Sequence, residues 1–84
     1  MTYDVKNANR SEKRALKLHK EAAAHTVVGD FISAKQKVAA AYGYHLAAKH
    51  YAEGNCGKAC KAEHKANQFA NGQIQFPKSL SQQS

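Results

Sequence analysis

The chain has 84 residues, of which 43% are hydrophobic, and a formal net charge of +7 at pH 7. This length allows one domain at most, and alanine supplies much of the hydrophobic fraction, so the core is small. No apolar run approaches the ~18–20 residues of a membrane-spanning helix, the first residues lack the apolar stretch of a signal peptide, and two cysteines are too few for a disulfide scaffold. We therefore expect a cytoplasmic protein with no membrane partner, whose small core is supplemented in a homo-oligomer or as a subunit of a complex.

Residues 10–28 are predicted to form the first helix. Asn9, followed three residues later by Glu12, resembles a capping box, and neither Gly nor Pro occurs between them and Gly29. Ala15, Leu18 and Ala22 recur at helical spacing and indicate the buried side. The other side carries the basic residues Arg10, Lys13, Arg14, Lys17 and Lys20.

Residues 31–53 are predicted to form the second helix, because Gly29 can end the first helix and Asp30 can cap the next. One apolar face consists of Phe31, Ala34, Val38, Ala41, Tyr42, His45 and Ala48. A second stripe on nearly the opposite side consists of Ala40, Tyr44, Ala47 and Tyr51. A helix that is apolar on two sides is expected to lie between two neighbours, so this helix is placed in the middle.

Residues 57–70 are predicted to form the third helix, after a second break at Gly54-Asn55. Residues 73–84 are polar and rich in Gln and Ser, which predicts an extended or disordered tail. The expected fold is therefore all-α, an up-down-up antiparallel bundle of three helices at about 10–28, 31–53 and 57–70. We expect one helical domain over residues 1–72 and a flexible tail over 73–84.

Two similar stretches, HTVVGDFISA and HYAEGNCGKA, align when the sequence is displaced by 25 positions. The alignment places His25 on His50, Gly29 on Gly54, and Asp30 opposite an amide residue. This pattern indicates one supersecondary unit that is used twice, with the middle helix shared. We expect His25 and His50 to lie in the last turns of their helices, where a protonated imidazole interacts favourably with the helix dipole.

The first of these turns resembles the turn and second helix of a tetratricopeptide-type repeat at Gly29-Asp30-Phe31, Ala34 and Ala41. A partial second copy consists of Gly54-Asn55, Ala59 and Ala66, with Cys56 in place of the aromatic residue. The period of 25 residues is shorter than the ~34 of that family, and its Trp-Leu-Gly signature is missing. The resemblance implies an antiparallel helical hairpin and a protein-binding role, without assigning any contact residue.

A possible metal set consists of His50, Cys56, Cys60 and His64. Three of these residues are spaced four apart, near one side of a helix, and thiolate and imidazole are zinc ligands. A zinc-stapled helical module is therefore one alternative. The separated second ligand pair of structural zinc sites is missing, so we favour two small, buried or half-buried thiols and a solvated histidine, and we expect no cofactor.

The sequence offers no arrangement that favours catalysis. Its carboxylates form no evident acid–base pair, and no third group orients a pairing of Cys60 with His64. The glycines are isolated, so no phosphate-cradling loop is predicted. We therefore expect a protein that is not an enzyme.

The positive charge predicts binding to an anionic partner, either a nucleic acid backbone or an acidic protein surface. The expected contacts are Arg10, Lys13, Arg14, Lys17 and Lys20, with Lys58, Lys61 and Lys65 as a second set. Alternatively, these charges only keep an alanine-rich bundle soluble. A competing prediction is a tetratricopeptide-like adaptor that binds protein through an interaction stripe of Tyr44 and Tyr51, and Tyr51 could instead stack on a nucleic acid base.

Overall fold

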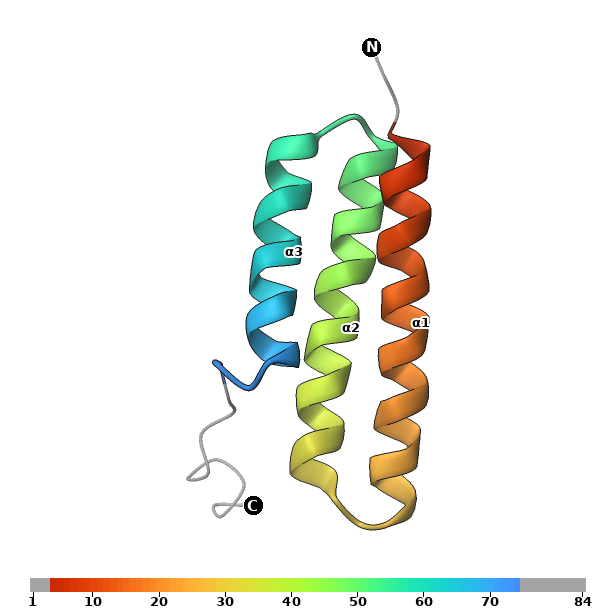
Figure 1. The fold of residues 1–84 in the computed structure, drawn as a ribbon, viewed down its shortest axis with the longest axis vertical. Helices are drawn as coiled ribbons and strands as arrows, with labels where there is room; N and C mark the ends of the chain where they lie inside the picture. The colour runs from red at the N-terminus through yellow and green to blue at the C-terminus, as the bar shows by residue number, and fades with distance from the viewer. Residues whose placement is uncertain (1–3, 75–84) are drawn as a thin grey trace.

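Three helices account for most of residues 4–74, the part of the chain that the computed structural model describes (Figure 1). They are α1 (Val5–Val27), α2 (Phe31–Ala52) and α3 (Cys56–Ala70). Successive helices run in opposite directions, and α2 lies between the other two. The predicted all-α, antiparallel three-helix bundle is confirmed, and α2 is the middle helix as expected. The predicted tail lies outside the described residues from residue 75 onward.

Each helix begins after a side chain that accepts a hydrogen bond from a backbone N–H of the first turn. Asp4 accepts from the N–H of Asn7 at the start of α1, and Asp30 accepts from the N–H of Ser33 at the start of α2. Asn55 accepts from the N–H of Lys58 at the start of α3. The predicted start of the first helix at residue 10 is therefore wrong, and Asn9 is an exposed residue inside α1. Because Asp4 caps the chain earlier and no Gly or Pro follows, the helix gains a turn.

The two Gly turns have the same backbone geometry. Gly29 and Gly54 both have a φ of 81°, the left-handed conformation that favours Gly. The backbone N–H that follows each Gly donates to the carbonyl of His25 or His50 at 2.8 Å. This bond satisfies one of the carbonyls at the end of the helix that have no partner within the helix. The sequence repeat thus corresponds to one helix-ending device used twice, with both histidines in the last turn of their helices.

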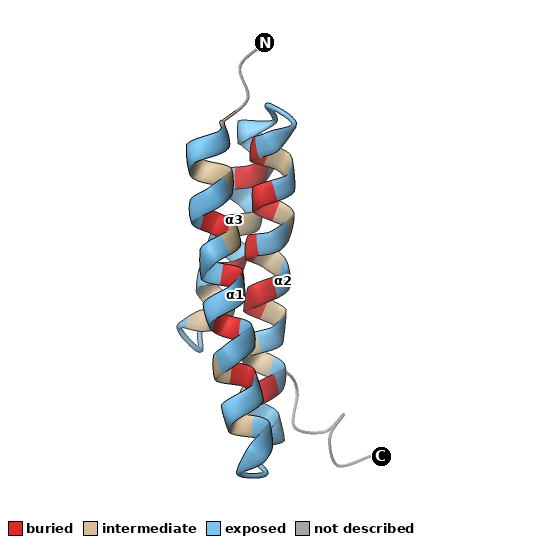
Figure 2. Cartoon of the chain, turned by 90° about the vertical axis from the view of Figure 1, so that its right-hand side faces the viewer, coloured by how far each residue is buried: buried red, intermediate tan, exposed pale blue. Residues whose placement is uncertain are grey.

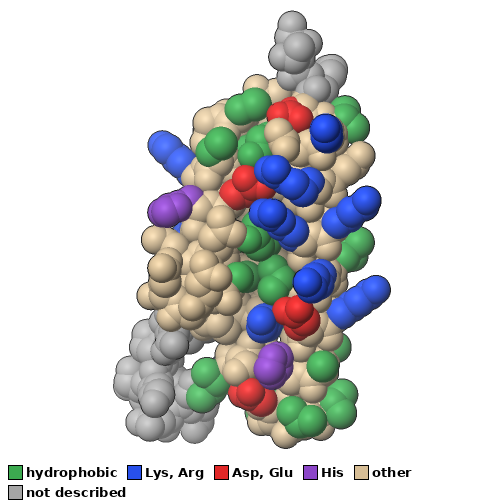
Figure 3. Space-filling model, viewed as in Figure 1, with side chains coloured by type: hydrophobic (Ala, Val, Ile, Leu, Met, Phe, Trp, Pro, Cys, Tyr) green, Lys and Arg blue, Asp and Glu red, His purple; other side chains and the backbone are tan. Residues whose placement is uncertain are grey.

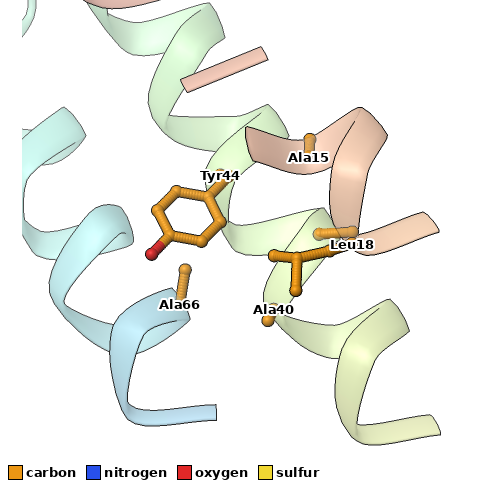
Figure 4. Close-up of a cluster of buried hydrophobic side chains, with 6 residues drawn as sticks. Ala15, Leu18, Ala40, Tyr44 and Ala66 are labelled. Carbon is orange, nitrogen blue, oxygen red and sulfur yellow. The ribbon is translucent and has the colours of Figure 1, made fainter. Parts of the chain in front are cut away.

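The core consists mainly of alanine. The alanines that are 0% exposed are Ala40, Ala41, Ala47, Ala59 and Ala66. Figure 4 shows Leu18 and Tyr44 as the large side chains of one cluster, with alanines of all three helices around them. Figure 2 shows the buried positions of α1 and α2 along their facing sides. Small side chains let the helices approach closely, but they bury little area per residue.

The first apolar face predicted for α2 is divided in the structure. Ala34, Ala41 and Ala48 are buried, whereas Phe31 and Tyr42 are 60% and 61% exposed. The alanines recur every seventh position, which is the spacing that keeps small side chains under one neighbouring helix. The larger side chains lie to one side of this contact and remain at the surface.

Candidate functional site

A row of exposed cations follows α1 over most of its length. Its members are Lys6, Arg10, Lys13, Arg14, Lys17 and Lys20. Figure 3 shows Lys and Arg side chains gathered along this helix. Lys6 was missed by sequence reasoning because the helix was expected to start only at residue 10. We call these six residues the α1 basic row.

The glutamates of α1 are engaged by side chains of α2. The Glu12 carboxylate lies 2.8 Å from Nδ1 of His45, and that of Glu21 lies 3.1 Å from Nζ of Lys37. Both acids are therefore turned towards the neighbouring helix. Within residues 4–74, Arg10 is the one member of the α1 basic row in an ion pair, 3.4 Å from Glu63. The row consequently presents a largely uncompensated positive charge.

Arg14 is exposed, but its guanidinium lies over the ring of a core tyrosine. Its guanidinium carbon lies 5.7 Å from the ring centroid of Tyr44, within the range of a cation–π contact. The hydroxyl of Tyr44 in turn donates to the side-chain oxygen of Asn67 in α3. Tyr44 thereby connects the α1 basic row to the other two helices.

Glu63 of α3 is the polar link between the two outer helices. Its carboxylate accepts hydrogen bonds from Ser11 of α1 at 2.5 Å and from Tyr51 of α2 at 2.9 Å. Partial burial alone would raise the pKa of Glu63, but these hydrogen bonds and the charge of Arg10 outweigh it and lower the pKa. Burial, together with the bond to this carboxylate, raises the pKa of Tyr51. The group therefore holds a carboxylate and a neutral phenol.

The second predicted basic set, on α3, does not join the α1 basic row. Lys58, Lys61 and Lys65 are exposed, and Lys65 lines a hollow together with Tyr42. Arg14 and Lys17 line a different hollow together with Tyr44. Tyr42 and Tyr44 are two positions apart in α2 and so point to nearly opposite sides of it. The two basic sets are thus separated by α2.

The predicted interaction stripe of Tyr44 and Tyr51 is wrong. Both side chains are only 5% exposed and lie between helices, where their hydroxyls bond to α3. They therefore present no ring face to a protein partner or to a nucleic acid base. The same two residues belong to the second apolar stripe of the middle helix, which was also expected to pack against a neighbouring helix, and their burial agrees with that expectation.

The structure does not bring the predicted metal set together. Within the described part of the chain, no group of three His, Cys, Asp or Glu side chains is placed to hold a metal ion. Cys56 and Cys60 are free and exposed, so the expected burial of the two thiols is wrong. His64 lies 3.4 Å from the Gln68 amide. His50 faces Glu53 instead, at 3.5 Å. The spacing of four residues drifts around α3, and His50 belongs to the last turn of α2.

The fold and the α1 basic row define the class: a small, basic, antiparallel three-helix protein with an alanine core. No protein-family model, curated protein or solved structure matches the chain. None of the helices in residues 4–74 combines the length and apolar character needed to span a bilayer.

Proposed function

We propose that the protein is a small, non-enzymatic nucleic-acid-binding protein that holds the phosphate backbone against the α1 basic row. One observation carries this proposal. The acids of α1 are engaged by α2, while Lys6, Lys13, Lys17 and Lys20 are exposed and have no acidic partner among the described residues. Such a surface attracts a polyanion and gains free energy by releasing its counterions.

The geometry suits a contact with a backbone rather than with base edges. From Lys6 to Lys20 the row covers about 21 Å of helix at 1.5 Å per residue. Most of its members are lysines, which act as point charges towards phosphate. Base reading favours bidentate Arg contacts, and the guanidinium of Arg14 lies over Tyr44. We therefore expect binding with little sequence preference.

Nucleic acid is favoured over an acidic protein surface because the row lacks an apolar centre. Protein interfaces combine an apolar core with a polar rim. Between Lys6 and Lys20, Leu16 is the single exposed large apolar side chain of α1. The tetratricopeptide-like adaptor remains a prediction, but the tyrosines that were expected to carry it are buried.

Fluorescence anisotropy tests the proposal on a labelled duplex of about 20 base pairs and on a single strand of the same length. The test variant replaces Lys13, Lys17 and Lys20 with Glu, and the matched control replaces Lys58, Lys61 and Lys65 with Glu. Both variants lower the net charge from +7 to +1. We expect the test variant to lose most of its affinity, and the control to retain much more.

The salt dependence gives a second readout. If the three lysines of the test variant each neutralise a phosphate, their removal reduces the slope of log affinity against log salt on duplex DNA by about 2.7. Equal losses in the two variants would contradict a site on α1, since net charge alone would then explain binding. Absence of binding at about 50 mM salt, where phosphate contacts are strongest, would overturn the proposal. Equal competition by polyglutamate would support an acidic protein partner instead.

A further inference from the structure

The exposed side of α2 forms an apolar groove that the proposed nucleic-acid contact does not use. Two adjacent hollows of about 560 and 300 Å³ share Ala39 and Tyr42 in their linings. Their larger apolar side chains are Phe31, Val38, Tyr42, Leu46 and Phe69. We call this surface the α2 groove.

The groove is open at the level of Phe31 because α3 is shorter than α2. α3 has 15 residues and α2 has 22. In Figure 1, α3 ends well before the turn that joins α1 and α2. The side-chain amide of Gln36 donates to the carbonyls of Phe69 and Ile74 and marks the level on α2 at which α3 ends. Phe31 lies beyond that level, and Val38 and Tyr42 are 45% and 61% exposed beside α3.

The spacing of the groove residues is that of a helix-packing seam. Phe31, Lys35, Val38 and Tyr42 are separated by four, three and four residues. This alternation keeps the side chains on one side of a helix. A second helix can pack on that side nearly parallel or antiparallel to the first. The stretch from Phe31 to Leu46 measures about 22 Å, enough for about four turns of a docked helix.

The charge around the groove selects the kind of helix. Lys35 lines one hollow, Lys65 lines the other, and neither hollow is lined by an acid. Within residues 4–74 neither lysine forms an ion pair. Lys49, which lies seven residues after Tyr42 on the same side of α2, has no ion-pair partner among these residues either. Two copies of this chain meeting through the groove would bring these cations together, which opposes self-association. An acidic partner would neutralise them.

We propose that the α2 groove binds an amphipathic helix of a partner protein, with apolar residues facing Val38, Tyr42 and Leu46 and acidic residues beside Lys35 and Lys65. Helix-in-groove recognition uses anchors at helical spacing for affinity. The flanking charges exclude wrong partners. The groove and the α1 basic row point to different sides of the molecule, so this proposal does not depend on nucleic-acid binding.

The test uses two labelled peptides of about 18 residues with identical leucines at the a and d positions of the heptad. One peptide carries Glu at the e and g positions, and the other carries Lys there. In fluorescence anisotropy, we expect the unmodified full-length protein to bind the Glu peptide at least about tenfold more tightly than the Lys peptide. The double variant Lys35→Glu, Lys65→Glu should reverse that preference. Tyr42→Asp should weaken binding of the Glu peptide at least about tenfold.

Controls separate lost binding from lost folding. All three positions named in the variants are at the surface, so helical circular dichroism should be unchanged. The triple variant of Lys13, Lys17 and Lys20 should bind the Glu peptide as before. Equal affinity for the two peptides, or an undiminished affinity in the double variant, would overturn the proposal. So would a dimer in sedimentation that Tyr42→Asp abolishes, or nuclear Overhauser contacts between Tyr42 and the chain's own Phe76 or Leu80.

Discussion

A Cβ atom placed on Gly43 of α2 would lie 2.7 Å from the Cβ of Ala66 in α3. Real Cβ atoms essentially never come so close, and the same atom would lie 3.2 Å from the Cα of Ala66. The two helices therefore meet across this pair with one side chain missing and the other reduced to a methyl group. This contact sets the distance between α2 and α3.

Gly43→Ala should destabilise the protein, although Ala is the better helix former. Helix propensity alone would stabilise α2 by about 1 kcal/mol, but overpacking of a tight helix contact costs about 1–3 kcal/mol. We expect the second effect to dominate, because the obstacle is backbone as well as side chain. Thermal unfolding followed by circular dichroism measures the sum of the two.

Gly57→Ala is the matched control for this substitution. Gly57 also lies in a helix, but a Cβ there meets no heavy atom within 4 Å. This variant should be neutral or more stable, by up to about 1 kcal/mol. If both Gly→Ala variants stabilised the protein equally, α2 and α3 would not be in the contact described.

Glu63→Gln should lower the free energy of unfolding at pH 7 by about 1 kcal/mol, because charge-assisted hydrogen bonds become neutral ones. The side chain is only 14% exposed, so water replaces the lost interactions poorly. For a domain of this size the melting temperature should fall by about 4–8 °C. An unchanged melting temperature would mean that Glu63 does not link α1 to α3.

The same carboxylate makes stability depend on pH in a defined direction. The pKa of Glu63 is lowered in the folded state, so the unfolded chain takes up its proton first as the pH falls. The stabilisation is complete above the ordinary Glu value of about 4.3 and is lost as the pH falls from there through the folded pKa.

Comparison of the unmodified protein with the Glu63→Gln variant isolates the contribution of Glu63 to the pH dependence of stability. The pKa values of Asp4 and Asp30 are also lowered, mainly by hydrogen bonds from Asn7 and Ser33, and they act in the same direction. Asp4 and Asp30 are both present in the Glu63→Gln variant, so their contribution is the same in the two proteins. The melting temperatures of the two proteins should therefore converge below about pH 4.3, and parallel curves down to acidic pH would contradict the assignment.

Asn55→Ala should destabilise the protein by about 1 kcal/mol, because the side chain accepts the N–H of Lys58 at the start of α3. Asn71→Ala is a suitable control. Asn71 follows the end of α3, and the helix-end bonds at that residue use its backbone N–H. Its replacement should change the stability by less than about 0.5 kcal/mol. Chemical denaturation of the two variants measures the difference.

Among Tyr42, Tyr44 and Tyr51, only Tyr42 should react readily with tetranitromethane. Tyr42 is 61% exposed, whereas the other two are 5% exposed and hydrogen-bonded. Mass spectrometry of the digested protein at low modification should therefore find nitration at Tyr42 first. Early nitration of Tyr51 would show that the contact with Glu63 opens in solution.

The helices and their ends follow from local sequence. Gly29 and Gly54 take a left-handed conformation that other residues avoid, and Asp30 and Asn55 supply the cap that starts the next helix. These interactions span only a few residues, so the repeat predicted both turns. The start of α1 was missed because Asn9 and Glu12 were interpreted as the cap. Asp4, which lies earlier in the chain, is an equally local signal and is the residue that caps the helix.

The burial of the tyrosines could not be predicted in the same way. Tyr42 and Tyr44 have the same chemistry and lie in the same helix, yet one is at the surface and the other in the core. The position of α1 and α3 around α2 decides between them. The regularly spaced Ala34, Ala41 and Ala48 were the available signal, since alanines at every seventh position mark where a neighbour approaches.

By itself, the sequence determined three capped helices, two identical Gly turns and a row of cations on the first helix, because each depends on residues within a few turns of one another. Only the tertiary structure decided which charges remain uncompensated and which apolar side chains remain exposed. Glu63 meets Ser11 across 52 positions of sequence, and Glu12 meets His45 across 33. Such pairings arise when helices pack, and no local pattern encodes them.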